Sequence, residues 1–267
     1  MTVKILVTND DGIDSPGLKA AVEAVMSLGE ITVIAPTSQQ TATGRGLTGN
    51  MESSFTPKEY YVAGKTIRAF HCDCSPALIV RHAMRTVYRS DKPDLLVSGI
   101  NYGENLGSTI TCSGTVGAAL EAANSRVPSI AISKQTDVRS HHVYTDQDWS
   151  ATQYFLNYFT KVLLRTEPQY DVDALKIDVP ADATIETKWE ITTVARTEYY
   201  TKSFKDPGWE SRLDEGTTIV NIDQKQIELG SDIHALAIKK IVSVTPLSID
   251  LTSRVNFARL QELYGSQ

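Results

Sequence analysis

The chain opens with a strand, a helix and a second strand, and this order constrains the fold more than any other feature of the sequence. Residues 3–8 and 31–35 are short apolar runs rich in β-branched side chains, which is typical of buried parallel strands. Between them, Leu18, Ala21 and Val25 recur at helical spacing. A strand–helix–strand unit of this kind requires a right-handed crossover between parallel strands. The opening therefore predicts an α/β fold.

The pattern continues and predicts a Rossmann-like core, with a mostly parallel sheet and helices on both of its faces. Strands and helices alternate up to about residue 180, as expected for repeated strand–helix–strand units. The predicted strands lie at 94–98, 129–132 and 175–179, the predicted helices at 75–88, 115–123 and 149–164, and a predicted hairpin at 60–68.

Beyond residue 180 the pattern changes to alternating runs, at 191–194 and 217–220, which predict an antiparallel C-terminal extension. A late strand over 238–245 and a terminal helix over 256–263 are also expected. We therefore divide the chain into a Rossmann-like catalytic core, residues 1–180, and an extension, residues 181–267. The extension is expected to carry a β-hairpin or oligomerisation arm and the terminal helix.

The composition excludes several classes of protein. A formal net charge of −6 argues against binding to nucleic-acid duplexes, and an acidic protein with an anionic substrate needs a local positive charge such as a metal ion. Three cysteines do not suggest a disulfide framework. The chain starts without the features of a signal peptide, and no apolar run approaches the ~18 residues of a membrane-spanning helix. We expect a cytoplasmic protein without a membrane partner.

Two adjacent carboxylates follow the first predicted strand, at the edge of the sheet where open α/β folds bind their ligands. Asp10 and Asp11 repel each other unless a positive charge lies beside them. Hard divalent cations such as Mg²⁺ and Mn²⁺ prefer oxygen ligands of this kind. The alternative is an ordinary turn, for which the pair Asp11-Gly12 is equally suitable.

The loops after two other strands add further polar groups. Residues 37–46 supply four hydroxyls, two amides and Arg45, which could pair with phosphate oxygens. A polar surface loop is the alternative for this segment. In the later loop, Asn101 follows its strand closely enough to offer an amide oxygen to a metal ion. Residues 113–115 open the next helix, whose free N–H groups and dipole favour an anion.

Several other nucleotide-binding and hydrolase signatures are missing from the sequence. There is no P-loop pattern, and no G-x-G-x-x-G fingerprint follows the first strand. A haloacid-dehalogenase-type phosphatase would carry D-x-D, whereas the two aspartates here are adjacent. No Ser–His–Asp set can be argued from spacing. His82 is expected to be structural, and His141 and His142 are expected to lie in a polar surface loop rather than in a lid.

Taken together, these loops resemble those of the SurE (survival protein E) family of nucleotidases. The resemblance rests on ILVTNDDGIDSPGL, VIAPTSQQTATGRGLT, KPDLLVSGINYGENLG and SGTVGAALEAA, followed by PSIAIS and, late in the chain, by VSVTPLSIDLT. It implies a Rossmann-like fold and a phosphoric monoester hydrolase, a 5′-nucleotidase that is often also a 3′-nucleotidase. It further implies one divalent metal ion, Mg²⁺ or Mn²⁺, and an extension that assembles the chain into a homodimer or homotetramer.

The resemblance also assigns the metal ligands. The two metal-binding aspartates of the family fall on Asp10 and Asp11, and its asparagine ligand falls on Asn101. The hydroxyl ligand falls on Thr41, where the family usually has Ser; Thr keeps the oxygen but restricts χ1. Residues 176–180 read Lys-Ile-Asp-Val-Pro, whereas the family usually has Asn before Val-Pro. This departure bears on substrate preference more than on the chemistry.

These assignments lead to a mechanistic hypothesis with Asp10, Asp11 and Asn101 as the catalytic residues. A water activated by the metal ion would attack the phosphorus of a nucleoside monophosphate in line. Either aspartate could instead act as general base or as nucleophile, and the sequence does not choose among these roles. Contacts with phosphate and substrate are expected from Asn9, Gly44, Arg45, Asn105, Ser113, Gly114 and Thr115.

Two other functions compete with this hypothesis. An exopolyphosphatase or general phosphomonoesterase would depend little on the base and sugar of its substrate. A non-catalytic nucleotide-sensing stress protein would have lost metal ligands, whereas all four metal-type positions here carry an oxygen donor. For base recognition, Tyr102 could stack on a nucleobase, or it could pack against its own loop.

Overall fold

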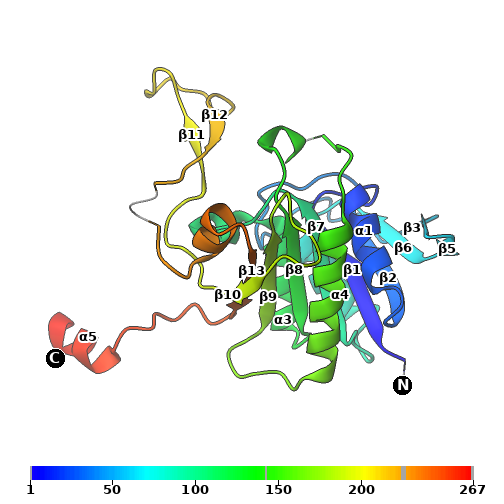
Figure 1. The fold of residues 1–267 in the computed structure, drawn as a ribbon. Coiled ribbons are helices and arrows are strands. Elements are labelled where there is room, and N and C mark those ends of the chain that lie inside the picture. Colours follow the sequence, from blue (N-terminus) through cyan, green and yellow to red (C-terminus); the bar gives the residue numbers. More distant parts are fainter. Residues whose placement is uncertain (1, 142, 224–226, 266–267) are drawn as a thin grey trace.

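A mixed sheet forms the centre of the molecule in the computed structural model, which describes residues 2–141, 143–223 and 227–265 (Figure 1). Nine strands of the described residues join it in the order β10-β13-β9-β8-β7-β1-β2-β6-β3. The six strands from β9 to β6 in this order run parallel to one another. The strands are β1 (Lys4–Thr8), β2 (Glu30–Pro36), β3 (Thr56–Lys58), β6 (Arg68–Cys72), β7 (Leu95–Tyr102), β8 (Ser129–Lys134), β9 (Ala174–Val179), β10 (Trp189–Ile191) and β13 (Val242–Leu247).

Helices cover both faces of this sheet, as the sequence predicts. On one face α1 (Pro16–Val25) packs beside α4 (Ser150–Arg165), and on the other α2 (Pro76–Arg85) packs beside α3 (Gly114–Asn124). Each pair of helices closes its own cluster of buried apolar side chains. The strands between them are buried on both sides, which explains their continuous apolar runs. The Rossmann-like α/β fold is confirmed.

The order of the strands brings the polar loops to one edge of the sheet. Strand β1 lies between β2 and β7, with Val7 opposite Val33 and Thr8 opposite Ser98. The strands that follow β1 in sequence are therefore added first on its β2 side and then on its β7 side. Ligands of open α/β sheets bind at the point where the strand order reverses in this way. The loop that follows β1, the loop that follows β2 and the loop that follows β7 all start at this edge.

The predicted hairpin over 60–68 is smaller than expected. Its strands, β4 (Tyr61–Val62) and β5 (Lys65–Thr66), have two residues each. The next residues form β6, which lies parallel to β2, and β3 then pairs antiparallel with β6. The sequence analysis did not predict β3 or β6. These strands occupy the edge that β2 would otherwise leave unpaired.

Several predicted boundaries in the second half of the chain are shifted. The strand expected at 238–245 is β13, and residues before it form the helical turn η3 (His234–Ile238). The strand expected at 191–194 is β10, which pairs parallel with β13 and so extends the central sheet. Both strands belong to the chain beyond residue 180, so this part completes the core sheet as well as extending from it.

The remaining elements lie outside the sheet. Strands β11 (Tyr200–Ser203) and β12 (Thr217–Val220) form an antiparallel hairpin. The terminal helix predicted over 256–263 is α5 (Phe257–Tyr264), and Asn256 caps its N-terminus. Two short 3₁₀ helices, η1 (Ser108–Cys112) and η2 (Val138–His141), interrupt loops. Within the described parts of the chain, no helix has both the length and the apolar character that crossing a membrane requires.

Candidate active site

A cavity of about 190 Å³ lies at the carboxyl edge of the sheet, beyond the ends of β1 and β7. A larger hollow of about 450 Å³ opens at the opposite edge, around Val127 and Val172, where ligands do not bind in folds of this class. The smaller cavity brings together six of the residues singled out from the sequence: Asp10, Asp11, Thr41, Asn101, Asn105 and Ser113.

The first carboxylate of the cavity, that of Asp10, lies against the N-terminus of α3. The Thr115 hydroxyl donates a hydrogen bond to its Oδ1 at 2.5 Å. A Cβ atom at Gly114 would lie only 2.7 Å from the Asp10 Cβ, so the glycine permits this close approach. Burial raises the pKa of Asp10, and hydrogen bonds from the Thr115 hydroxyl and from the backbone at Gly114 and Thr115 oppose the rise. Gly114 and Thr115, which were predicted to contact phosphate, therefore contact Asp10 in the structure.

The second carboxylate, that of Asp11, is also buried, with 3% of the residue exposed. Its Oδ2 accepts a hydrogen bond from the Tyr102 backbone N–H, and its Oδ1 accepts one from Gln39 Nε2, both at 3.2 Å. Burial and the neighbouring charge of Asp10 raise the pKa of Asp11 to about 8. Without a positive charge beside them, two buried carboxylates this close together are unfavourable in free energy when both are ionised.

The donor set of the cavity fits a hard divalent cation. Asp10 and Asp11 offer carboxylate oxygens, and a cation between them would relieve their repulsion. Asn101 Nδ2 donates to the Gly103 carbonyl oxygen at 2.7 Å, which leaves the amide oxygen to serve as a ligand. Thr41, which carries a hydroxyl, lines the same cavity. In the described ranges no three His, Cys, Asp or Glu side chains could together hold a metal ion, so this set depends on neutral oxygens.

Arg45, predicted to contact phosphate, has a carboxylate partner in the structure. Its Nε donates to Glu121 Oε2 at 2.8 Å, and Arg81 Nε donates to the other oxygen of Glu121 at 2.6 Å. The Glu121 side chain is 1% exposed and so requires a counter-charge. Arg45 therefore ties the loop after β2 to α3.

Two other residues expected to contact phosphate have roles in their own loops. The Asn9 side chain accepts from the Gly12 N–H at 3.2 Å and donates to the Gly12 carbonyl oxygen at 3.1 Å, which closes the turn after β1. Gly44 has a φ of +53°, and a Cβ there would lie 2.6 Å from the carbonyl oxygen of Thr111. The glycine thus allows two loops to approach, and Asn9 and Gly44 lie around the cavity rather than in its lining.

The cavity also contains residues that the sequence analysis did not assign to it. Gln39 bridges the site, because its Nε2 donates to Asp11 and, at 2.6 Å, to the His141 carbonyl oxygen. His141 lines the cavity, contrary to the expected surface position; His142 lies outside the described residues. The His141 ring meets that of Tyr200 edge-on, with centroids 5.5 Å apart, so the β11–β12 hairpin reaches the site.

The Tyr102 ring packs inside the protein, against residues 144–149 and not against its own loop, which was the alternative to base stacking drawn from the sequence. Only 3% of Tyr102 is exposed. Its ring contacts those of Trp149 and Tyr144, and its hydroxyl donates to the Thr145 carbonyl oxygen at 3.1 Å. The ring therefore fastens residues 144–149 beside the cavity, and a nucleobase would need another surface for stacking.

These features define a Rossmann-like α/β protein with a paired-carboxylate site at the switch point of its sheet. Residues 5–201 match the family described as Survival protein SurE. The chain is 40% identical to "5′-nucleotidase SurE" of Thermococcus kodakarensis, covering 99% of this chain and 100% of the relative, and 40% identical to the protein of the same name from Archaeoglobus fulgidus, covering 96% and 95%. The crystal structure of the SurE protein from Aquifex aeolicus superimposes with a TM-score of 0.73 at 29% identity, covering 98% of this chain and 100% of that one. The chain belongs to the SurE family.

Proposed function

We propose that this chain is a divalent-metal-dependent 5′-nucleotidase whose active site is the cavity around Asp10 and Asp11. Relatives that align over nearly the whole chain carry the name 5′-nucleotidase, which makes the chain a phosphomonoester hydrolase of nucleoside monophosphates. The observation that carries the assignment of the site is the pair of buried carboxylates, which face one cavity together with Thr41 and Asn101.

Different residues of the cavity would bind the metal ion and the phosphoryl group. When bound, a divalent ion supplies Lewis-acid polarisation of a phosphate oxygen and lowers the pKa of a water. Asp10, Asp11, Thr41 and Asn101 would hold the ion through oxygen atoms. The Ser113 hydroxyl caps α3 by accepting from the Val116 N–H, and its own proton can be donated to a phosphoryl oxygen. Such a bond strengthens as charge redistributes in the transition state.

Phosphate release from nucleotides tests this proposal. We expect release from 5′-AMP and 5′-GMP with Mg²⁺ or Mn²⁺, loss of release in EDTA, and recovery when Mn²⁺ is returned in excess. Assays with 3′-AMP and short polyphosphate measure the breadth of the activity. Release that persists in EDTA would refute the metal dependence, and equal rates with polyphosphate would favour a general phosphomonoesterase.

We also propose that residues 181–267 assemble the chain into a homodimer or homotetramer. The helix α5 has no buried residue and stands away from the core (Figure 1). Its Phe257 and Leu263 side chains are exposed, as is Trp209 in the hairpin region. Apolar side chains gathered on such projecting segments mark a surface that another protein covers.

Light scattering tests the assembly. We expect a mass of at least two chains, and a shift towards the monomer when Phe257 and Leu263 are both replaced by Ser. Tyr170→Ser, at an exposed aromatic residue in the loop between α4 and β9, should leave the mass unchanged. A monomeric wild-type protein at micromolar concentration would contradict the proposal.

A further inference from the structure

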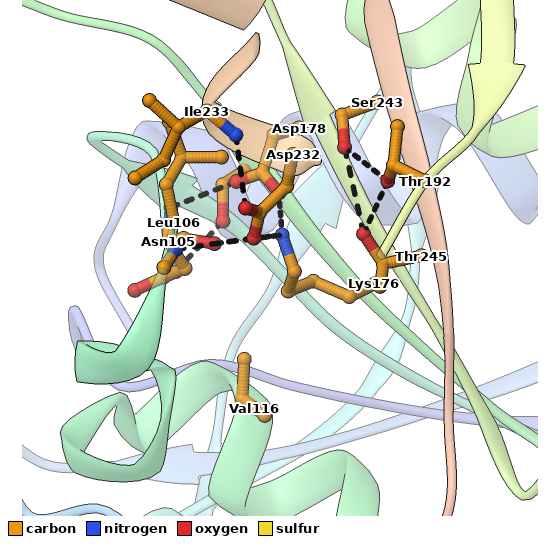
Figure 2. Close-up of polar contacts among 12 residues, drawn as sticks. Asn105, Leu106, Val116, Lys176, Asp178, Thr192, Asp232, Ile233, Ser243 and Thr245 are labelled. Atoms are coloured by element: carbon orange, nitrogen blue, oxygen red, sulfur yellow. Dashed lines mark hydrogen bonds and ion pairs between the residues drawn. The ribbon is translucent and has the colours of Figure 1, made fainter. Parts of the chain in front are cut away.

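A lysine and two aspartates form a charged cluster in the protein interior, next to the cavity but separate from its lining. Lys176 lies in β9, and its side chain is 1% exposed. Its Nζ lies 2.5 Å from Asp178 Oδ2, 3.1 Å from Asp232 Oδ2 and 2.8 Å from the carbonyl oxygen of Asn105 (Figure 2). Each of the three ammonium hydrogens therefore has an acceptor.

The two carboxylates bind the backbone of the loop that follows β7. Asp178 Oδ1 accepts from the Asn105 N–H at 2.7 Å (Figure 2). Asp232 Oδ2 accepts from the Gly107 N–H at 3.1 Å. Both polar backbone atoms of Asn105 are thus bonded to buried charges. The other oxygen of Asp232 accepts from the backbone N–H groups of Ala195 and Ile233.

Burying such a charged cluster is unfavourable in free energy, because its groups lose their hydration. Both aspartates are fully buried, and two carboxylates face one ammonium. Burial raises the pKa of Asp178 despite the opposing charge of Lys176. Well-packed apolar side chains of similar size are often at least as stabilising as a buried ion pair. What the apolar side chains would not provide is a set of fixed acceptors and donors for the backbone at Asn105 and Gly107.

We propose that Lys176, Asp178 and Asp232 are positioning residues for the nucleotidase reaction, which hold the Asn105 side chain in the cavity where phosphate binds. The Asn105 side chain lines the cavity, and its Nδ2 donates to Ser133 Oγ at 2.8 Å. With its backbone fixed on both sides, this residue keeps one orientation towards the cavity. The inference rests on the proposed function, because it assumes that phosphate occupies this cavity.

The cluster also connects two parts of the chain. Lys176 and Asp178 belong to the core strand β9, whereas Asp232 precedes η3 in the extension beyond residue 180. The extension thereby supplies one of the three charged groups that fix the loop.

A neighbouring polar cluster provides a matched control. The hydroxyls of Thr192, Ser243 and Thr245 are buried and bond to one another, with Thr192 Oγ1 2.8 Å from Ser243 and 2.7 Å from Thr245 (Figure 2). These bonds join β13 to the residue after β10. Thr245→Val should therefore reduce stability without moving Asn105.

The test compares variants of Asp178 by calorimetric titration of inorganic phosphate into the Mn²⁺-loaded protein and by hydrolysis of 5′-AMP. Asp178→Ala removes the acceptor of the Asn105 N–H but leaves Lys176 paired with Asp232. We expect its Kd for phosphate to rise, and its kcat/KM to fall, by about tenfold or more, as is usual when a supporting contact of a site is lost. Asp178→Asn keeps an acceptor for the Asn105 N–H, so its phosphate Kd and its kcat/KM should stay within about threefold of wild type. The same is expected of Thr245→Val, even where its loss of Tm equals that of Asp178→Ala.

A second variant covers the case in which Asp178→Ala does not fold. The double substitution Lys176→Met with Asp178→Asn removes the Nζ bond to the Asn105 carbonyl and leaves the net charge of the cluster at −1, because a lysine and an aspartate are neutralised together. Its phosphate Kd should also rise by about tenfold.

Three results would overturn the inference. The first is a wild-type phosphate Kd in folded Asp178→Ala or in the double variant. The second is a rise in Kd that follows the loss of Tm equally in all variants, Thr245→Val included. The third is a wild-type protein that binds no phosphate. A wild-type protein that binds phosphate but hydrolyses no nucleotide refutes the proposed function alone, and the phosphate affinities of the variants still decide the inference.

Discussion

Replacing Asp10 by Asn is expected to lower kcat/KM for 5′-AMP by about 10³-fold, the largest effect expected from a single conservative change. The amide keeps an oxygen that can accept the Thr115 hydrogen bond, so the loop should retain its shape. It removes one of the two charges on which binding of a divalent ion depends, and stabilisation of phosphoryl charge by a metal contributes several kcal/mol. Steady-state kinetics at saturating Mn²⁺ measure the loss.

The stability of the metal-free variant should change in the opposite direction. Burial raises the pKa of Asp10, and its charge adds to the raised pKa of Asp11, so the neutral amide should leave Tm in EDTA equal to or above that of wild type. Asp14→Asn is the matched control, because Asp14 lies in the same loop but is exposed and pairs with Lys58. An Asp10→Asn enzyme that keeps more than about a tenth of wild-type activity would refute the assigned site.

The fold was largely predictable because its signals are local. The apolar runs of β1, β2, β7, β8 and β9 and the helical spacing between them are properties of neighbouring residues. The strands β3 and β6 escaped prediction for the opposite reason. Residues 68–72 show no clear alternation, and they form a strand because the edge of β2 is available to them. Such pairing depends on contacts between distant residues rather than on local preference.

The candidate site divides in the same way. The meeting of Asp10, Asp11 and Asn101 in one cavity was predictable because Asp10 and Asp11 closely follow β1 and Asn101 lies at the carboxyl end of β7. The fold alone brings those strand ends together. The pairing of Arg45 with Glu121 was not predictable, because the two residues lie 76 positions apart in the sequence. Tyr200 reaches the cavity from the extension, and no local pattern signals that contact.

Gly114→Ala is expected to lower kcat/KM by about 10²-fold, although it adds one methyl group and removes no polar atom. The new Cβ would lie 2.7 Å from the Asp10 Cβ and 2.8 Å from its Oδ2, so Asp10 or the start of α3 must move. Because Asp10 is buried and bonded to Thr115, the shift is transmitted to the carboxylate. A displacement of about 1 Å at a reacting group can reduce the rate by this amount. Overpacking should also lower stability by about 1–3 kcal/mol.

The kinetic and stability losses of Gly114→Ala can be separated by experiment. Gly208→Ala is the matched control, because a Cβ at Gly208 would meet no atom within 4 Å, and neither its Tm nor its kcat/KM should fall. Calorimetric titration of Mn²⁺ into Gly114→Ala should show weakened binding, since the displaced group is a proposed ligand. Normal Mn²⁺ affinity together with wild-type kcat/KM would show that Asp10 is not held against α3 in the working enzyme. Weakened Mn²⁺ binding at an unchanged Tm would instead show that the methyl group acts by displacing the Asp10 carboxylate and not by destabilising the fold.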